Sequence, residues 1–125
     1  MKVTPVLYVE AIEPCLPFWV DRVGFEKTVE VPHGDRLGFV ILVKGGCEVM
    51  LQTWASAEAD DARLLRGPRG MSAALFVEVD DFADIRRRLE GADVVVPERT
   101  TFYGMREIFV SDPAGHIVGF AAPEK

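Results

Sequence analysis

The sequence contains little cysteine and no long apolar run. Cys15 and Cys47 are its two cysteines, and they lie far apart without the CxxC spacing of paired thiols. A disulfide framework is therefore excluded, and we expect both to be reduced, buried and equivalent to small hydrophobic residues. The longest aliphatic stretch, Phe39 to Val43, is far too short to cross a bilayer. With no recognisable signal peptide at its start, the chain is expected to be cytoplasmic and without a membrane segment.

Positive charge is also scarce. The chain has 14 Lys and Arg against 20 Asp and Glu, a net charge of -6, and such a surface repels nucleic-acid phosphates. The basic run Arg86-Arg87-Arg88 lies beside Asp84 and Glu90, which indicates a solvated helix face. The sequence also lacks a P-loop, a nucleophile elbow and a paired-cysteine metal site. We therefore expect no nucleic-acid partner.

The end of the chain carries the clearest local signal. Two apolar runs flank Asp112-Pro113-Ala114-Gly115, in which Pro113 presets φ for a tight turn and Gly115 accepts a positive φ. This pattern predicts a β-hairpin. Its second arm contains Gly119, and a glycine inside a strand indicates a bulge or a close approach by another group.

Upstream, the pattern predicts a strand, a helix and a meander of three strands. Leu16, Trp19 and Val23 recur at helical spacing, between Pro14 at the helix start and Gly24 at its end. The four strands are expected at residues 3–10, 25–31, 37–43 and 48–54.

After a polar stretch and the breaker-rich Arg66-Gly67-Pro68-Arg69-Gly70, the same order returns. A strand at 73–79 precedes a helix that Asp81 caps, with Asp84 completing a capping box and Gly91 ending the helix. Further strands are expected at residues 93–96, 101–110 and 116–122.

These elements form a repeat. Val9-Glu10 corresponds to Val77-Glu78, and Lys44-Gly45-Gly46-Cys47 to Asp112-Pro113-Ala114-Gly115, at one constant offset. The chain is thus predicted to be α+β, a single domain 1–125 of two tandem βαβββ modules at about 1–54 and 71–125, joined by a linker 55–70. Each module would leave one sheet face uncovered, so two curved sheets, from one chain or from the two chains of a dimer, are expected to face each other and enclose a pocket.

Short motifs along the whole chain resemble the vicinal oxygen chelate superfamily, which holds glyoxalases, extradiol dioxygenases, fosfomycin-resistance enzymes and bleomycin-resistance proteins. The motifs are Thr4-Pro5-Val6-Leu7-Tyr8-Val9, Phe18-Trp19 with Val23-Gly24-Phe25, Phe76-Val77-Glu78-Val79-Asp80-Asp81, Tyr103-Gly104-Met105-Arg106-Glu107 and Asp112-Pro113-Ala114-Gly115-His116. The resemblance implies the glyoxalase/bleomycin-resistance fold but does not fix one activity, because this fold hosts many chemistries.

The resemblance also implies four metal-ligand positions, which fall here at Thr4, within Met50-Leu51-Gln52, at Ala74 and at Gly119. A divalent ion needs imidazole, carboxylate or thiolate ligands, and these residues supply none. We therefore predict that the protein has no metal and no cofactor, and that Gly119 leaves room where a ligating side chain would stand.

Four other residues are possible substitutes for these ligands. His33 and His116 are assigned to turns or the surface rather than to a ligand or a base. Glu48 and Glu107 could point into the cavity, although a charge at the rim is the simpler interpretation of each. Glu107, with apolar neighbours, is the better candidate.

Strand alternation and the resemblance together assign a mostly apolar set to the pocket. For Phe76 and Met50, plain core packing stays an alternative, whereas Trp54, Phe102 and Tyr103 are expected to border the mouth. The predicted ligand-binding residues are Tyr8, Phe39, Met50, Gln52, Trp54, Phe76, Phe102, Tyr103, Met105, Glu107 and Gly119.

The expected function is a metal-free, homodimeric protein similar to the bleomycin-resistance branch, which binds and sequesters a planar, apolar or cationic small molecule. The alternative is an enzyme, either a glyoxalase-like lyase or dioxygenase with an atypical metal site, or a metal-free acid–base catalyst using Glu107. A third possibility is a module that serves only protein interaction.

Overall fold

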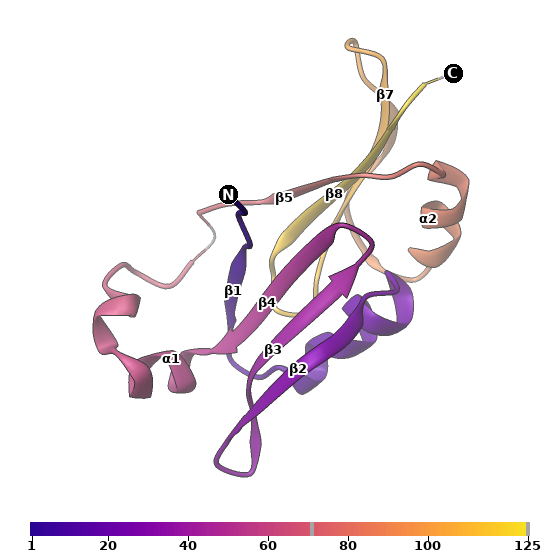
Figure 1. Cartoon of the computed structure of the whole chain (residues 1–125). Helices are drawn as coiled ribbons and strands as arrows, with labels where there is room; N and C mark the ends of the chain where they lie inside the picture. Colours follow the sequence, from indigo (N-terminus) through magenta and orange to yellow (C-terminus); the bar gives the residue numbers. More distant parts are fainter. Residues whose placement is uncertain (71, 125) are drawn as a thin grey trace. The chain divides into compact units, whose positions relative to one another are not determined.

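A computed structural model describes residues 1–70 and 72–124 of the chain (Figure 1). The chain divides into two compact units, Met1–Gly70 and Met71–Lys125. Each unit contains one four-stranded sheet and short helices, so the predicted α+β fold is confirmed.

The sheet of the first unit has the strand order β1-β4-β3-β2. Strand β1 runs parallel to β4, whereas β4 with β3 and β3 with β2 are antiparallel pairs. A parallel neighbour requires a crossover between β1 and the meander, and the helical turns η1 and η2 provide it. The bounds are β1 Val6–Val9, η1 Glu13–Cys15, η2 Pro17–Arg22, β2 Glu26–His33, β3 Arg36–Lys44 and β4 Cys47–Thr53.

The second unit repeats this topology with the order β5-β8-β7-β6, in which β5 runs parallel to β8. Its crossover helix α2 is capped as predicted, because the Asp81 side chain accepts from the amide of Asp84 at 3.1 Å. The bounds are β5 Leu75–Glu78, α2 Phe82–Arg88, β6 Asp93–Thr100, β7 Met105–Ser111 and β8 Ile117–Pro123. The repeated βαβββ order is therefore confirmed.

Alternation along the strands places the core on one face of each sheet. In the first unit Val40 and Leu42 of β3 pair with Leu51 and Val49 of β4, and all four side chains are buried. In the second unit Ile108 and Val110 of β7 pair with Phe120 and Val118 of β8 and are buried likewise. The remaining face of each sheet is thereby left for other contacts.

The helix predicted from Pro14 to Gly24 is wrong in its type. Cys15 donates its amide to the carbonyl of Ile12 in a 3-10 turn, and Val23 donates to Phe18 across a π-helical turn. Pro14 and Pro17 lack backbone donors, so a regular α-helical ladder cannot run through them. Its predicted end is correct, since Gly24 has φ of 94°.

The boundary predicted at the end of the meander is also wrong by one residue. Strand β4 stops at Thr53, whose side chain caps a helix, and Trp54 is the first residue of α1, Trp54–Asp60. A 3-10 turn, η3 at Ala62–Leu65, follows. The segment predicted as a linker thus contains helical structure within the first unit.

The strands β6 and β7 differ from their predicted bounds as well. Strand β6 continues to Thr100, because Arg99 and Thr100 pair with Glu107 and Arg106 beyond an irregularity in the register. The final hairpin is confirmed: Gly115, at φ of 92°, donates its amide to the carbonyl of Asp112.

Cys15 is buried as expected, but the prediction for Cys47 is wrong, since it is exposed next to the Gly45-Gly46 turn. Among the described residues, no helix is long and apolar enough to span a bilayer.

Candidate functional site

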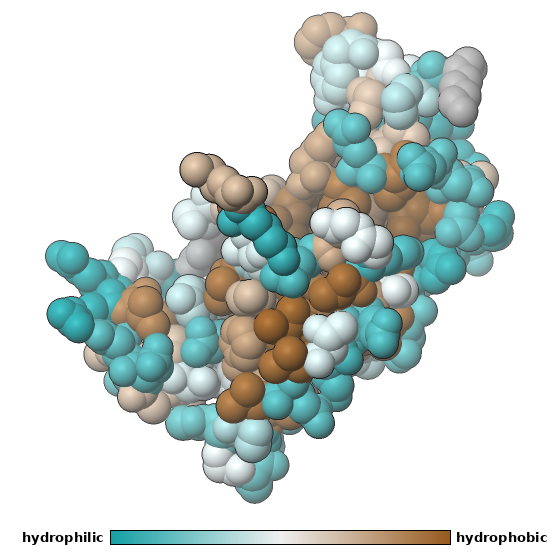
Figure 2. All heavy atoms as spheres, viewed as in Figure 1, coloured by the Kyte–Doolittle hydropathy of each residue, from teal (hydrophilic) through white to brown (hydrophobic). Residues whose placement is uncertain are grey.

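The first sheet gathers four of the predicted ligand-binding residues on its uncovered face. In one row Phe39 pairs with Gln52, which pairs in turn with Tyr8, and in the next row Met50 lies between Ile41 and Val6. Figure 2 shows apolar side chains gathered over β3 and β4. We call this surface the Tyr8 face, defined as Val6, Tyr8, Val29, Val31, Phe39, Ile41, Met50 and Gln52.

Trp54 lies at the edge of the Tyr8 face because of the cap at the start of α1. The Thr53 hydroxyl accepts from the amide of Ser56 at 3.1 Å, which turns the chain sharply out of β4. The ring of Trp54 then lies 5.2 Å from that of Tyr8, with 31° between the planes. The Gln52 amide nitrogen lies 3.3 Å from the Ser56 hydroxyl oxygen. Two aromatic rings and an amide are thus held together.

Glu48 lies two residues before Met50 on β4, toward the other end of this face. Polar contacts hold its carboxylate there. Lys2 lies 3.0 Å from one oxygen, and the Thr4 hydroxyl donates to the other at 3.1 Å. The Lys2 ammonium, with the Thr4 hydroxyl, holds the pKa of Glu48 below its ordinary value of 4.5. The carboxylate therefore stays ionised at neutral pH and is engaged at the rim of the sheet.

On the second sheet, Gly119 lies between two phenylalanines. Phe76 of β5 and Phe109 of β7 are its direct neighbours in the register, and their rings are 6.4 Å apart. We call this surface the Phe76 face, defined as Phe76, Glu78, Met105, Glu107, Phe109 and Gly119.

The prediction that Gly119 leaves room for a ligand is wrong in this structure. A Cβ atom built on Gly119 would lie 2.4 Å from Cε2 of Phe109, because that ring covers the glycine. The glycine is therefore a site of close packing, the other outcome expected of a glycine within a strand. The ring of Phe76 is half exposed beside it.

Glu107 also lies on the Phe76 face and is fully buried, with 1% of its surface exposed. Arg99 binds one carboxylate oxygen with Nε at 3.0 Å and Nη2 at 2.9 Å. The Tyr103 hydroxyl donates to the other oxygen at 3.0 Å. With both oxygens engaged, Glu107 acts here as an acceptor that fixes Arg99 and Tyr103.

Phe102 and Met105 flank this group. Phe102 is fully exposed, and its ring meets that of Tyr103 edge-on at 5.1 Å. The amide of Met105 donates to the Thr101 hydroxyl at 3.0 Å, which closes the loop between β6 and β7. Both residues therefore belong to the same end of the second unit as Tyr103.

The two histidines are at turns, as predicted. His33 ends β2 at the hairpin to β3 and is exposed. His116 precedes β8, and its Nδ1 lies 3.4 Å from an Asp112 oxygen that also accepts from the His116 amide. Asp112 is buried and organises this turn.

The predicted residues thus form two groups. Tyr8, Phe39, Met50, Gln52 and Trp54 belong to the first unit, and the remaining six to the second. Sequence reasoning missed Phe109 and Arg99. Phe109 lies opposite Gly119 across the predicted hairpin, so counting the register outward from Asp112-Pro113-Ala114-Gly115 would have found it. Arg99 could be placed beside Glu107 only if β6 was known to continue to Thr100.

The four family ligand positions do not fit a divalent metal. The Thr4 hydroxyl is committed to Glu48, Gln52 offers an amide, Ala74 has only a methyl group, and Phe109 covers Gly119. Across residues 1–70 and 72–124, no three His, Cys, Asp or Glu side chains are grouped closely enough to hold an ion.

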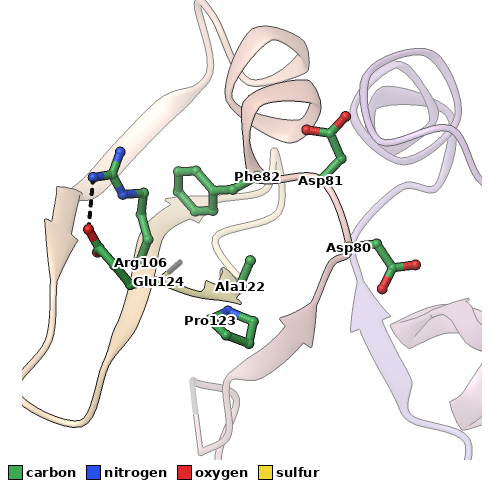
Figure 3. Close-up of a pocket in the computed structure, with 7 residues that line it drawn as sticks. All are labelled: Asp80, Asp81, Phe82, Arg106, Ala122, Pro123 and Glu124. Atoms are coloured by element: carbon green, nitrogen blue, oxygen red, sulfur yellow. Dashed lines mark hydrogen bonds and ion pairs between the residues drawn. The ribbon is translucent and has the colours of Figure 1, made fainter.

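A hollow of about 570 Å³ lies elsewhere in the second unit, where β5 leads into α2. Figure 3 shows the Phe82 ring between the Arg106–Glu124 ion pair and Asp81, while Asp80 and Asp81 direct their carboxylates away from that pair. None of the eleven predicted site residues lines this hollow. It is therefore separate from the predicted site.

Solved structures share this fold across nearly the whole chain. A glyoxalase/bleomycin resistance protein/dioxygenase family enzyme from Burkholderia phytofirmans PsJN matches with TM-score 0.79 and 15% identity over 96% of both chains. Lactoylglutathione lyase from Agrobacterium tumefaciens matches with TM-score 0.72 and 19% identity over 98% of this chain and 92% of that one.

TnmS3, an antibiotic binding protein from Streptomyces sp. CB03234, matches with TM-score 0.70 and 22% identity over 99% of this chain and 97% of that one. No curated protein sequence is significantly similar to the chain. The family model of the glyoxalase/bleomycin resistance protein/dioxygenase superfamily matches residues 3–120, and its match spans both βαβββ units. The chain therefore belongs to the glyoxalase/bleomycin resistance protein/dioxygenase superfamily.

Proposed function

We propose that this protein binds and sequesters a planar, apolar or cationic small molecule without a metal ion. The observation that carries the proposal is the composition of the Tyr8 face. Its part-exposed Tyr8, Phe39 and Met50 are the neighbours of Gln52, and at its edge the Trp54 ring contacts that of Tyr8. Apolar surface with a few placed polar groups is the usual lining of a small-molecule site.

The absence of a metal from the proposed mechanism rests on donor chemistry. Hydroxyl, amide and methyl groups at Thr4, Gln52 and Ala74 are poor ligands for zinc, iron or manganese. At the fourth position, the Phe109 ring occupies the space that a glutamate side chain at Gly119 would need. Binding would instead use ring stacking and shape, which favour planar ligands.

The named relatives support two classes of function. TnmS3 is described as an antibiotic binding protein, which agrees with sequestration, whereas the Agrobacterium protein is described as a lyase. For an acid–base enzyme, Glu107 would be the candidate base. Its two oxygens are already engaged by Arg99 and Tyr103, and this favours binding over catalysis.

We further propose that the protein is a homodimer, since the largely apolar Tyr8 face is left uncovered by the helices of its own unit. We propose a cytoplasmic location because both cysteines are free thiols. Analytical ultracentrifugation at micromolar concentration should give the mass of a dimer. A compact monomer alone would refute the dimer.

The binding proposal is tested by a thermal-shift screen of aromatic antibiotics and metabolites, followed by calorimetry of the best compound. Trp54→Ala should weaken binding by roughly 3- to 30-fold, the equivalent of one aromatic or cation–π contact. Leu64→Ala, an exposed apolar change in η3, serves as the matched control and should leave affinity unchanged. Turnover of the compound, or equal affinity in both variants, would contradict the proposal.

A further inference from the structure

A cation already lies on the candidate binding surface. The Arg69 guanidinium carbon lies 4.5 Å from the centre of the Trp54 ring, and the Trp54 ring lies 5.2 Å from that of Tyr8 in a tilted contact. Nη1 of Arg69 also lies 3.3 Å from a carboxylate oxygen of Glu10. A guanidinium, an indole, a phenol and a carboxylate thus lie close together.

The fold explains why these residues meet. Tyr8 and Glu10 lie two residues apart at the end of β1, and Val9 between them pairs with Thr53, so Trp54 emerges beside that end. The Thr53 cap fixes the turn into α1. After α1 and η3 the chain brings Arg69 back over the Trp54 ring. Tyr8, Glu10 and Trp54 are therefore positioned by the sheet, whereas Arg69 arrives from an irregular segment.

Arg69 is held only by weak contacts. Its side chain is 57% exposed and that of Glu10 is 85% exposed, so water competes for their ion pair. Cation–π attraction is likewise small while both partners remain hydrated. A ligand that buries the Trp54 ring more completely can therefore displace the arginine.

We propose that Trp54, Tyr8 and Glu10 form a binding site for a planar, delocalised cation, and that Arg69 occupies this site as an internal stand-in until the ligand displaces it. The ligand class is a guanidinium, an amidinium or a protonated heteroaromatic ring. This inference rests on the proposed function, because it places the ligand on the surface that contains Trp54.

The chemistry of the stand-in defines the ligand. A guanidinium is planar and stacks on an aromatic face, whereas a compact ammonium offers no flat surface to Trp54. Glu10 supplies the opposite charge, so anions are excluded. Arg69 also lines a hollow of about 260 Å³ together with Glu58, which gives the displaced guanidinium an alternative position next to a carboxylate.

The probes are 9-aminoacridine, a planar cation at neutral pH, and acridone, an uncharged molecule of similar shape, with affinities measured by calorimetry. Arg69→Gln removes the internal cation and should tighten 9-aminoacridine binding by about 3- to 10-fold. Glu10→Gln should weaken it by about 2- to 5-fold. Acridone should respond to Glu10→Gln by less than about 2-fold, whereas Arg69→Gln, which frees the Trp54 ring, should tighten acridone binding but less than it tightens 9-aminoacridine binding.

Arg66→Gln is the matched control, because it removes one exposed arginine from the same segment. Its affinities should equal those of the wild type, and thermal melts should show that all the variants are folded. Arg69→Gln should also shift the indole N–H resonance of Trp54 in the ligand-free protein, as removal of a stacked cation requires.

Two results separate this inference from the proposed function. If Trp54→Ala weakens a ligand from the screen but Arg69→Gln leaves or lowers the affinity for 9-aminoacridine, the stand-in is refuted and the binding function stands. Absence of 9-aminoacridine binding in both the wild type and Arg69→Gln also overturns the inference. If in addition no compound of the screen binds, the proposed function fails with it.

Discussion

The two sheets share one topology but differ in what they offer to a ligand. By strand pairing, Phe39 beside Gln52 on the Tyr8 face corresponds to Glu107 beside Ala121 on the Phe76 face, so the offset between the units is not constant as the sequence predicted but grows from 68 residues at β3 and β7 (107 − 39) to 69 at β4 and β8 (121 − 52). The first position is part-exposed and aromatic, whereas the second is a buried carboxylate bound by Arg99 and Tyr103.

A second matching pair differs in the same direction. Met50 keeps a flexible, part-exposed side chain between Ile41 and Val6, while Gly119 lies under the ring of Phe109. The two units therefore share one strand order but carry different side chains on the open face of the sheet. The Tyr8 face leaves polarisable side chains exposed to a ligand. On the Phe76 face, Glu107 is already bound by Arg99 and Tyr103, and the Phe109 ring packs over Gly119.

The largest effect is expected from removing the buried carboxylate. Glu107→Ala should lower the free energy of unfolding by about 2–3 kcal/mol, because a charged hydrogen bond typically contributes about 1.5–3 kcal/mol and exposed Arg99 regains water. The loss is measured by urea denaturation. Glu78→Ala, an exposed carboxylate on the same face, is the control and should change stability little. Equal losses in the two variants would show that the contacts of Glu107 with Arg99 and Tyr103 add no stability to this face.

Gly119 provides the next test. Gly119→Ala should cost about 1–3 kcal/mol, since its Cβ collides with Phe109 and overpacking is destabilising. In a Phe109→Ala background the same change should cost much less. This double-mutant cycle is read by chemical denaturation. The same cost in both backgrounds would show that the ring does not limit the position.

The smallest effect concerns acid. The pKa of Glu48 lies below 4.5 because of Lys2 and Thr4, so its contribution to stability is complete above 4.5 and is lost as the pH falls through the lowered value. Glu48→Gln should therefore flatten the fall in stability as the pH drops below the ordinary value of 4.5. Denaturation midpoints above and below that value measure it, and a steeper fall in the variant would contradict the assignment.

Sequence reasoning predicted the fold well because the repeat, the turns and the strand alternation are local patterns. Pro14 correctly marks the start of a helical segment, but what the missing donors of Pro14 and Pro17 do to the helical hydrogen bonds depends on which carbonyls remain in reach. Trp54 was assigned to a strand because alternation continues through Thr53, whose capping role appears only once the chain turns.

The sequence predicted which residue types the candidate site contains, but not which contacts these residues make. Alternation is enough to group Tyr8 with Glu10 and Met50 with Gln52, since it needs only the period of a strand. The cover over Gly119 and the partners of Glu107 depend on side-chain directions across β6 and β7, where the register shifts. Arg69 over Trp54 joins residues with no shared periodicity.

The most direct test of the central claim is one calorimetric titration of the best planar ligand from the screen, performed with and without an excess of a metal chelator. Metal-free binding predicts the same affinity and the same stoichiometry in both titrations. Loss of binding on chelation, recovered by adding a divalent ion, would show that a metal completes the site and would contradict the account.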